Sequence, residues 1–420
     1  MDLIETFGAK IGALSEEKPQ RARQLLTAGF RANGVKNKLA SKRSSKSDRM
    51  LFQLVNRAMV TCLAKPQSNV MVSLFTPCEM LHLQGLHPYS CEGFSSYLSG
   101  AMAEQPFLHQ AEDTGIPNSL CSYHKVFIGA AQMGLMPKPR FILSTSLACD
   151  ANTLTFRHLA QFYDVPHFNV DIPFESSPQA VDYVAGQLRQ MGEFLTRQTG
   201  LPLDDGQLAR TVARSQRTMA LYHRGLRPRA GRQVLSDLTS ELLRTAAFHF
   251  LLGTPETEAY ARQLLREITT APPAQGKQLL WIHTTPYWVA PLRHLFAQST
   301  RVQVAACDMS YEGIVEADPT KPYEAMARRL VYSPFNGPAQ RRIDRALEMA
   351  KTVGADGAVW FCHWGCKHTL GGARLGKKAL EEAGLPTLLL DGDSCDRGFG
   401  GEGQAATRME AFLEVLEGMA

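Results

Sequence analysis

Residues 357–372 have the sequence GAVWFCHWGCKHTLGG, in which a short apolar run leads into two cysteines, two histidines and a lysine. An apolar run without polar interruption is typical of a strand whose two faces are both covered by helices. The Gly-Cys-Lys step at 365–367 marks the loop that follows this strand. In open parallel sheets, ligands bind beyond the carboxyl ends of the strands. The stretch therefore predicts an α/β fold and places its cysteine loop where such a fold binds ligands.

Short apolar runs alternate with helical segments along most of the chain. We expect strands at 69–75, 140–146, 165–173, 277–286, 301–310, 357–366 and 386–393. Helical periodicity fills much of the remainder, including the N-terminus. This alternation predicts an α/β protein with two doubly wound parallel sheets, a helical N-terminal segment and a helical bridge. The expected division is a helical segment at 1–66, a first α/β domain with a helical extension at 67–270, and a second α/β domain at 271–420.

Composition and charge exclude several classes of protein. With 44% hydrophobic and 20% charged residues among 420, the chain has the composition of a soluble globular protein of two or three domains. The net charge of +5 comes partly from one basic run at 36–50, so no nucleic-acid partner is expected. No stretch of about 20 apolar residues could span a membrane, and the N-terminus lacks the apolar core of a secretion signal. The expected location is cytoplasmic.

The cysteines carry the most informative chemistry. Nine cysteines, an odd number, in a cytoplasmic chain predict reduced thiols or metal ligands rather than disulfides. Cys362 and Cys366 are four positions apart, which does not fit a redox C-x-x-C motif, and no second pair completes a zinc site. We expect Cys366 in the exposed loop and Cys362 in the packed strand.

Three of the cysteines share one kind of position. Cys121 and Cys149 each stand where a helix is expected to begin, and Cys366 lies in the loop after a strand. The positive end of a helix lowers the pKa of a thiol at its N-terminus. Three such thiolates could hold a [4Fe–4S] cluster by three corners and leave one iron open for substrate. The alternative, that each is a small buried residue without a chemical role, stays open at this point.

Longer motifs extend this pattern. Residues 361–416 combine the Gly-Cys-Lys loop with G-x-P-x-L-x-L-D-G-D and G-Q-x-x-T-R-x-E-A-F patterns. Upstream lie FTPCEMLHLQGLHPY at 75–89, LCSYHKVFIGAA at 120–131 and ACDANTLTF at 148–156. In these motifs the chain resembles the 2-hydroxyacyl-CoA dehydratase and benzoyl-CoA reductase family. The resemblance runs from about residue 69 to the end and is loose over the helical bridge.

The resemblance implies two Rossmann-like domains with a [4Fe–4S] cluster between them, bound by Cys121, Cys149 and Cys366. It also implies an acyl-CoA substrate, a homologous or identical second subunit, and a separate ATP-dependent iron–sulfur activator that supplies one electron. Reduction of the thioester carbonyl would give a ketyl radical that expels the hydroxyl group, so the enzyme would be a lyase. In the reductase branch an aromatic ring is reduced instead. An unactivated β-proton is far too weak an acid for a side-chain base, so a low-potential cofactor must carry the difficult step.

The chain departs from the family pattern at its extra thiols. Cys78 stands in TPCEM where the family usually has an acidic residue, and further cysteines accompany the motifs at Cys91, Cys362 and Cys395. This raises an alternative within the family, the double-cubane cluster proteins, in which six cysteines hold two bridged clusters and small molecules are reduced. Two other classes stay open: an electron-relay protein without its own substrate, and a cluster-free α/β binding protein.

Further residues are candidates for supporting roles. Glu79 and His82 are three apart after the first strand, and on a helix they would share a face and could move protons near the open iron. Lys367 could keep the charge beside Cys366 positive. The aspartates of LDGDSCDR at 390–397 could bind magnesium, although bonds to loop amides and a neighbouring arginine are the more ordinary outcome.

Overall fold

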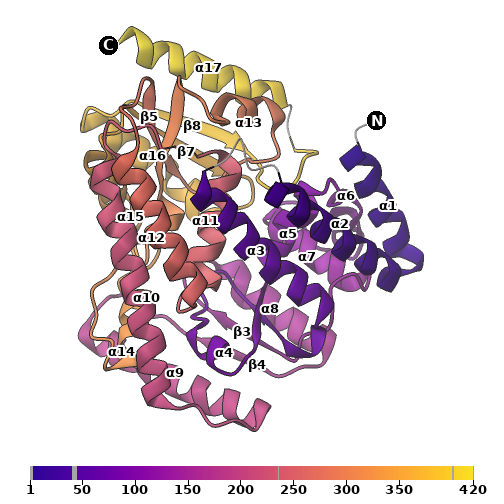
Figure 1. Cartoon of the computed structure of the whole chain (residues 1–420). Coiled ribbons are helices and arrows are strands. Elements are labelled where there is room, and N and C mark those ends of the chain that lie inside the picture. Colours follow the sequence, from indigo (N-terminus) through magenta and orange to yellow (C-terminus); the bar gives the residue numbers. More distant parts are fainter. Residues whose placement is uncertain (1–2, 40–44, 235, 400–401, 420) are drawn as a thin grey trace.

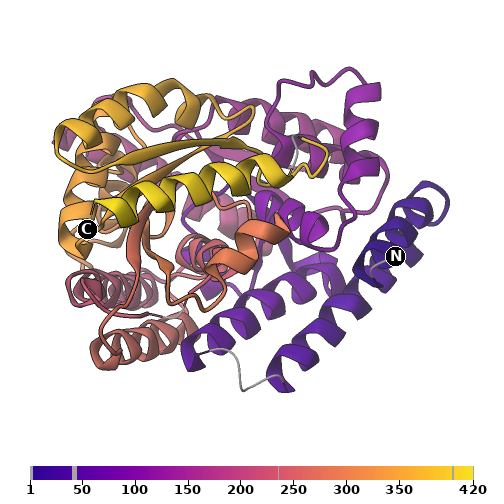
Figure 2. The same ribbon diagram turned by 90° about the horizontal axis from the view of Figure 1, so that it is seen from above.

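A computed structural model describes residues 3–39, 45–234, 236–399 and 402–419. The protein is an α/β protein with two four-stranded, all-parallel sheets, and this confirms the predicted fold class. Three helices form the N-terminal segment: α1 (Leu3–Glu17), α2 (Pro19–Leu39) and α3 (Lys46–Ala64). They lie side by side along one edge of the molecule, with α3 nearest its centre (Figures 1 and 2).

The first sheet has the strand order β2-β1-β3-β4. Its strands are β1 (Asn69–Val72), β2 (His87–Ser90), β3 (Phe141–Thr145) and β4 (His167–Val170). The helices of this part are α4 (Glu79–Leu83), α5 (Cys91–Gly100), α6 (Gln105–Asp113), α7 (Ser122–Gln132) and α8 (Asp150–Tyr163). The sequence did not predict β2, because helix was expected between the strands at 69–75 and 140–146; its four residues include Pro88. Pro88 is tolerated since β2 is the edge strand of the sheet.

The second sheet has the order β6-β5-β7-β8. Its strands are β5 (Lys277–Ile282), β6 (Val302–Cys307), β7 (Gly357–His363) and β8 (Thr387–Gly392). Its helices are α13 (Ala290–Phe296), α14 (Pro322–Val331), α15 (Ala339–Val353), α16 (Lys367–Glu382) and α17 (Glu402–Gly418). Every residue of β7 is buried, as expected for an apolar strand with helices on both faces.

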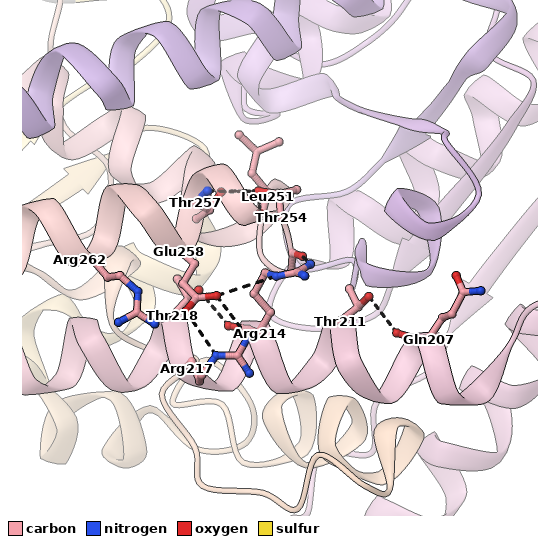
Figure 3. Close-up of polar contacts among 11 residues, drawn as sticks. Gln207, Thr211, Arg214, Arg217, Thr218, Leu251, Thr254, Thr257, Glu258 and Arg262 are labelled. Atoms are coloured by element: carbon pink, nitrogen blue, oxygen red, sulfur yellow. Dashed lines mark hydrogen bonds and ion pairs between the residues drawn. The ribbon is translucent and has the colours of Figure 1, made fainter.

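Four helices bridge the two sheets: α9 (Pro178–Thr199), α10 (Asp205–Leu226), α11 (Leu238–Phe250) and α12 (Pro255–Thr270). Polar side chains tie α10 to α12 at the surface (Figure 3). Glu258 of α12 accepts two hydrogen bonds of 3.3 Å from Arg217 of α10 and a further bond from Arg262 of its own helix. Exposed ion pairs of this kind contribute little to stability.

The apolar core is continuous across both halves of the chain. One cluster of buried side chains runs from the first sheet through the bridge helices into the second sheet, and another lies beneath the N-terminal helices. The two sheets fall within the segments 67–270 and 271–420, but the predicted division into domains stays a prediction. Among the described residues, no helix combines the length and apolarity needed to cross a bilayer.

Candidate functional site

Each of the three cysteines expected to bind a cluster stands at the start of a helix. Cys121, Cys149 and Cys366 are the N-cap residues of α7, α8 and α16. α8 follows β3 and α16 follows β7, so two of the three stand just beyond the carboxyl ends of parallel strands. All three are partly exposed, whereas Cys362 is buried in β7, as the sequence predicts.

The three cysteines line the same cavity, whose volume is ≈ 170 Å³. Burial raises the pKa of Cys121, and the neighbouring Cys366 and Cys149 raise it further, so the three thiols lie within electrostatic reach of one another. In the described part of the chain, no three Cys, His, Asp or Glu side chains are arranged to hold a single metal ion. A [4Fe–4S] cluster is bound at separate irons, so its ligands do not have to converge on one point.

A glycine brings two of the cysteine loops into contact. Gly365 has a φ of +76°, and a Cβ atom built on it would lie 2.6 Å from the backbone nitrogen of Cys121 and 2.7 Å from its Cα. Only glycine accepts both the left-handed conformation and this close approach. The loop before Cys366 therefore packs directly on the backbone of Cys121, and this contact joins the two halves of the chain at the site.

Burial is the largest influence on the pKa values of these three thiols. It raises the pKa of Cys149 to about 12, and it also raises the pKa of Cys366. Backbone N–H groups at the start of each helix act in the opposite direction without prevailing. The expectation that the helix N-termini favour thiolates is therefore wrong, because the cost of burying a charge exceeds the stabilisation from the helix ends.

His363 donates a hydrogen bond to one of the cysteines. Its Nδ1 atom accepts the backbone N–H of Ser394 at 3.1 Å, and burial lowers the pKa of this histidine. The neutral ring must then carry its proton on Nε2, which lies 3.2 Å from the Sγ atom of Cys121. The Nε2–H group of His363 is therefore a directed hydrogen-bond donor to the sulfur of Cys121 in a cavity whose lining is mostly apolar.

The cation beside Cys366 is an arginine rather than the expected lysine. Lys367 is exposed, whereas Arg342 is buried and partly offsets the rise that burial causes in the pKa of Cys366. Arg342 pairs with Asp308 at 2.7 Å and lies 3.3 Å from Nδ1 of His368. Arg342 could not be foreseen from the sequence, because α15 brings it beside Cys366 from another segment of the chain.

Glu92 is the carboxyl group of the cavity. It is the second residue of α5, directly after the edge strand β2 that the sequence reasoning missed. Its Oε1 atom accepts the backbone N–H of Leu74 at 3.1 Å, and its Oε2 atom has no hydrogen-bond partner. Burial raises the pKa of Glu92 to about 7, and its charge is felt by Cys149. A carboxyl group in this state can exchange a proton near neutral pH.

Other polar atoms in the cavity also lack partners, and part of its backbone is strained. Within the described residues, the unpartnered buried atoms of the lining include Tyr89 OH, Tyr97 OH, Asn152 Oδ1 and His283 Nδ1. His283 also has a φ of +83°, and Ala148, next to Cys149, has a φ of +66°. Unpaired polar atoms and strained backbone both concentrate at functional sites.

Comparison with known proteins identifies the family. A family model described as 2-hydroxyglutaryl-CoA dehydratase, D-component, matches residues 73–416. The chain belongs to this dehydratase family. It is 22% identical over 343 residues to the (R)-phenyllactyl-CoA dehydratase alpha subunit of Clostridium sporogenes, an alignment that covers 74% of this chain and 80% of the relative. The family predicted from the cysteine motifs is therefore confirmed.

The dehydratase family match begins after α3, yet α3 supplies part of the cavity wall. The two residues predicted to move protons lie elsewhere. Glu79 forms a buried ion pair with Arg329 at 2.7 Å and accepts a hydrogen bond of 2.9 Å from Ser215. Burial lowers the pKa of His82 to about 4, and its Nε2 atom has no partner. Neither residue lines the cysteine cavity, so their part in proton transfer stays a prediction.

The four extra thiols of this dehydratase-family chain are dispersed. The Cys78 thiol donates a hydrogen bond to the backbone carbonyl of Thr76, and its charged neighbours are Glu79 and Arg329. The charged neighbours of Cys362 are Asp391 and Arg408. The charge of Glu92 raises the pKa of Cys91, and nearby acids that include Asp393 raise the pKa of Cys395. None of the contacts found in the described residues joins two of these four thiols.

The aspartates at the end of β8 and in the loop after it bond to loop amides and to a neighbouring arginine, as expected. Asp393 accepts the backbone N–H groups of Cys395 and Asp396 at 2.7 Å and the hydroxyl of Ser122 at 2.6 Å. Asp391 pairs with Arg408 of α17 at 2.8 Å. Through Ser122, next to Cys121, Asp393 ties this loop to the start of α7.

Proposed function

We propose that the chain is the [4Fe–4S] cluster-bearing subunit of a 2-hydroxyacyl-CoA dehydratase-like enzyme, a lyase that removes water from an acyl-CoA thioester. Cys121, Cys149 and Cys366 would bind the cluster. One observation carries the proposal: three thiols, each capping a different helix, line one cavity together. Membership of the dehydratase family supports the same reaction class.

The donor set suits such a cluster. Three thiols are the ligands that iron–sulfur clusters take from proteins, and three leave one corner open. Because burial raises the pKa of each thiol, the thiols need a strong cation to become thiolates, and bound iron is such a cation. The N–H of His363 and the first backbone N–H groups of α8 and α16 face the sulfur atoms and would stabilise their negative charge.

When bound, the cluster would supply an electron at a reduction potential low enough to reduce the thioester carbonyl. The protein's own residues orient the thioester and exclude water. Glu92, whose pKa burial raises to about 7, holds a proton below neutral pH and would donate it to the departing hydroxyl group. The apolar lining around it keeps the carboxyl group poorly hydrated.

The proposal includes two protein partners and a CoA thioester. The curated relative is named as an alpha subunit, which supports a second subunit here. The electron would come from an ATP-dependent activator. The double-cubane alternative has less support, because Cys78, Cys91, Cys362 and Cys395 share no contact among the described residues.

Anaerobic iron and sulfide analysis of the reconstituted protein tests the cluster. We expect about four irons per chain in the wild type and a clear loss in single Cys→Ala variants at Cys121, Cys149 and Cys366. Cys362→Ala is the matched control, because this buried cysteine does not line the cavity. Fewer than about one iron per chain would instead favour a cluster-free binding protein, and about eight would favour the double cubane.

A turnover assay separates an enzyme from an electron relay. The protein, a partner subunit, an activator, ATP and a 2-hydroxyacyl-CoA should yield the unsaturated thioester. A cluster that accepts electrons while no 2-hydroxyacyl-CoA loses water would support the relay instead.

A further inference from the structure

Two helices form an apolar wall of the cysteine cavity. Most of the side chains that they contribute are apolar: α3 supplies Val55, Ala58, Met59 and Cys62, and α11 supplies Leu242, Leu243, Thr245, Ala246 and Phe250. The spacing within each set puts its side chains on one face of the helix. The two helices pack against each other and lie together near the middle of the molecule (Figure 1). α3 precedes residue 73, where the family match begins, so part of this wall lies outside the matched segment.

Arg342, the cation beside Cys366, pairs with Asp308 and does not itself line the cavity. Among the described residues that line it there is neither a lysine nor an arginine, and Glu92 is its one carboxyl group. The histidines of the lining stand on other elements than α3 and α11: His124 on α7, His283 after β5, His363 on β7 and His368 on α16. A carboxylate placed against α3 and α11 would be buried in a lining without lysine or arginine, and burying an unpaired charge is strongly unfavourable.

We propose that α3 and α11 form the subsite for the acyl side chain of the substrate, and that this subsite selects apolar acyl groups and rejects those with a second carboxylate. The inference deepens the proposed function and depends on it for the thioester. Because the wall and the thiols belong to one cavity, an acyl group held by this wall stays in the same enclosed space as the reacting centre. Rejection results from an unpaired charge in the wrong ligand, a common basis of specificity.

Two alanines in the wall make the subsite testable, because replacing either with a larger side chain would fill it. Ala246 and Ala58 lie on facing helices and are both only partly buried, so a larger side chain at either position enters the cavity rather than the core. Ala209 of α10 is a matched control, because it is also partly buried on a helix but does not line the cavity.

The experiment is calorimetric binding to the anaerobically reconstituted full chain. The probes are 3-phenylpropionyl-CoA and glutaryl-CoA, two thioesters without the hydroxyl group that would be eliminated. We expect the phenylpropionyl thioester to bind at least about tenfold more tightly. Ala246→Leu should weaken its binding by about tenfold or more, while Ala209→Leu should leave it unchanged. Ala58→Leu gives a second test from the opposite wall if Ala246→Leu does not fold.

Each outcome has a defined meaning. Equal affinity for the two thioesters, tighter binding of glutaryl-CoA, or equal effects of Ala246→Leu and Ala209→Leu would overturn the subsite. Failure of both thioesters to bind would overturn it as well. Iron and sulfide content, measured on the same samples, decides separately whether the cysteines hold a cluster, so failure of the subsite and failure of the proposed function can be told apart.

Discussion

The Nε2 atom of His363 lies 3.2 Å from the Sγ atom of Cys121, and Nδ1 of the same ring is fixed by the backbone N–H of Ser394. The histidine is therefore a directed donor to a sulfur atom. Hydrogen bonds to ligand sulfurs raise the reduction potential of an iron–sulfur cluster, because they stabilise the additional electron.

Replacing this histidine should make the centre harder to reduce. We expect His363→Leu to shift the reduction potential to more negative values by ~40 mV, since one hydrogen bond contributes ~1 kcal/mol and the couple transfers one electron. A potentiometric titration followed by electron paramagnetic resonance measures this shift. His249→Leu, at a histidine outside the cavity, should leave the potential unchanged. An unchanged or more positive potential in His363→Leu would contradict the assigned contact.

Gly365 is the second test, because its Cβ would collide with backbone atoms of Cys121. We expect Gly365→Ala to separate the two loops, to cost about 1–3 kcal/mol of stability and to reduce the iron bound per chain. Urea unfolding and iron analysis measure the two effects. Gly371→Ala on α16 is the control, since a Cβ there would meet no atom within 4 Å. Full iron content in Gly365→Ala would show that the loop contact is not needed.

Glu92 should control how the reaction depends on pH. Burial raises its pKa to about 7, so the carboxyl group is protonated below this pH and loses its proton above it. If it donates a proton to the departing hydroxyl group, the rate falls as the pH rises through about 7, and Glu92→Gln loses both this limb and roughly 10²–10⁴-fold in kcat. The measurement is kcat/KM against pH.

A second buried carboxyl group serves as the control for Glu92. Burial raises the pKa of Glu312 to about 8, but Glu312 does not line the cavity. Glu312→Gln should keep the wild-type pH profile. If Glu92→Gln also kept it, another group would have to supply the proton.

The ion pair between Glu79 and Arg329 should matter for stability. Burial alone would raise the pKa of Glu79, but the guanidinium of Arg329 outweighs it and lowers the pKa. The folded-state pKa therefore lies below the unfolded value, and this part of the stability is present above the unfolded pKa and lost as the pH falls through the folded one.

Removing one partner of this pair leaves a buried charge behind. We expect Arg329→Met to lower the free energy of unfolding at pH 7 by about 3–5 kcal/mol, as measured by urea unfolding. Lys378→Met, which breaks an exposed pair with Glu382, should change it by less than about 1 kcal/mol. A small effect of Arg329→Met would mean that Glu79 finds another partner or becomes protonated.

The sequence predicted the strands better than it predicted the walls of the cavity. Seven strands could be located, because apolar runs bounded by turns are a local signal, whereas β2, with the sequence HPYS, contains no such run and was missed. The position of Cys149 and Cys366 after strands was enough to expect each of them beyond the carboxyl end of its own sheet, where such sheets bind ligands. The position of Arg342 beside Cys366 and that of α3 in the cavity wall could not be foreseen, because only tertiary packing produces them.

The thiol pKa values show where a local rule fails. The start of α8 at Cys149 could be predicted from the residues that follow it, but the degree to which the rest of the protein covers this thiol could not. Burial is a property of the whole fold. It reverses the direction that the helix end alone would give.

The contact of Gly365 with Cys121 has a consequence for biosynthesis. The loop of Cys121 leaves the ribosome well before the loop of Gly365 and Cys366, so a nascent chain cannot present all three thiols until its second sheet has formed and docked. A protein that delivers iron would find no complete set of three thiols on a truncated or partly folded chain. Cofactor insertion would thus act as a checkpoint that only the finished protein can pass.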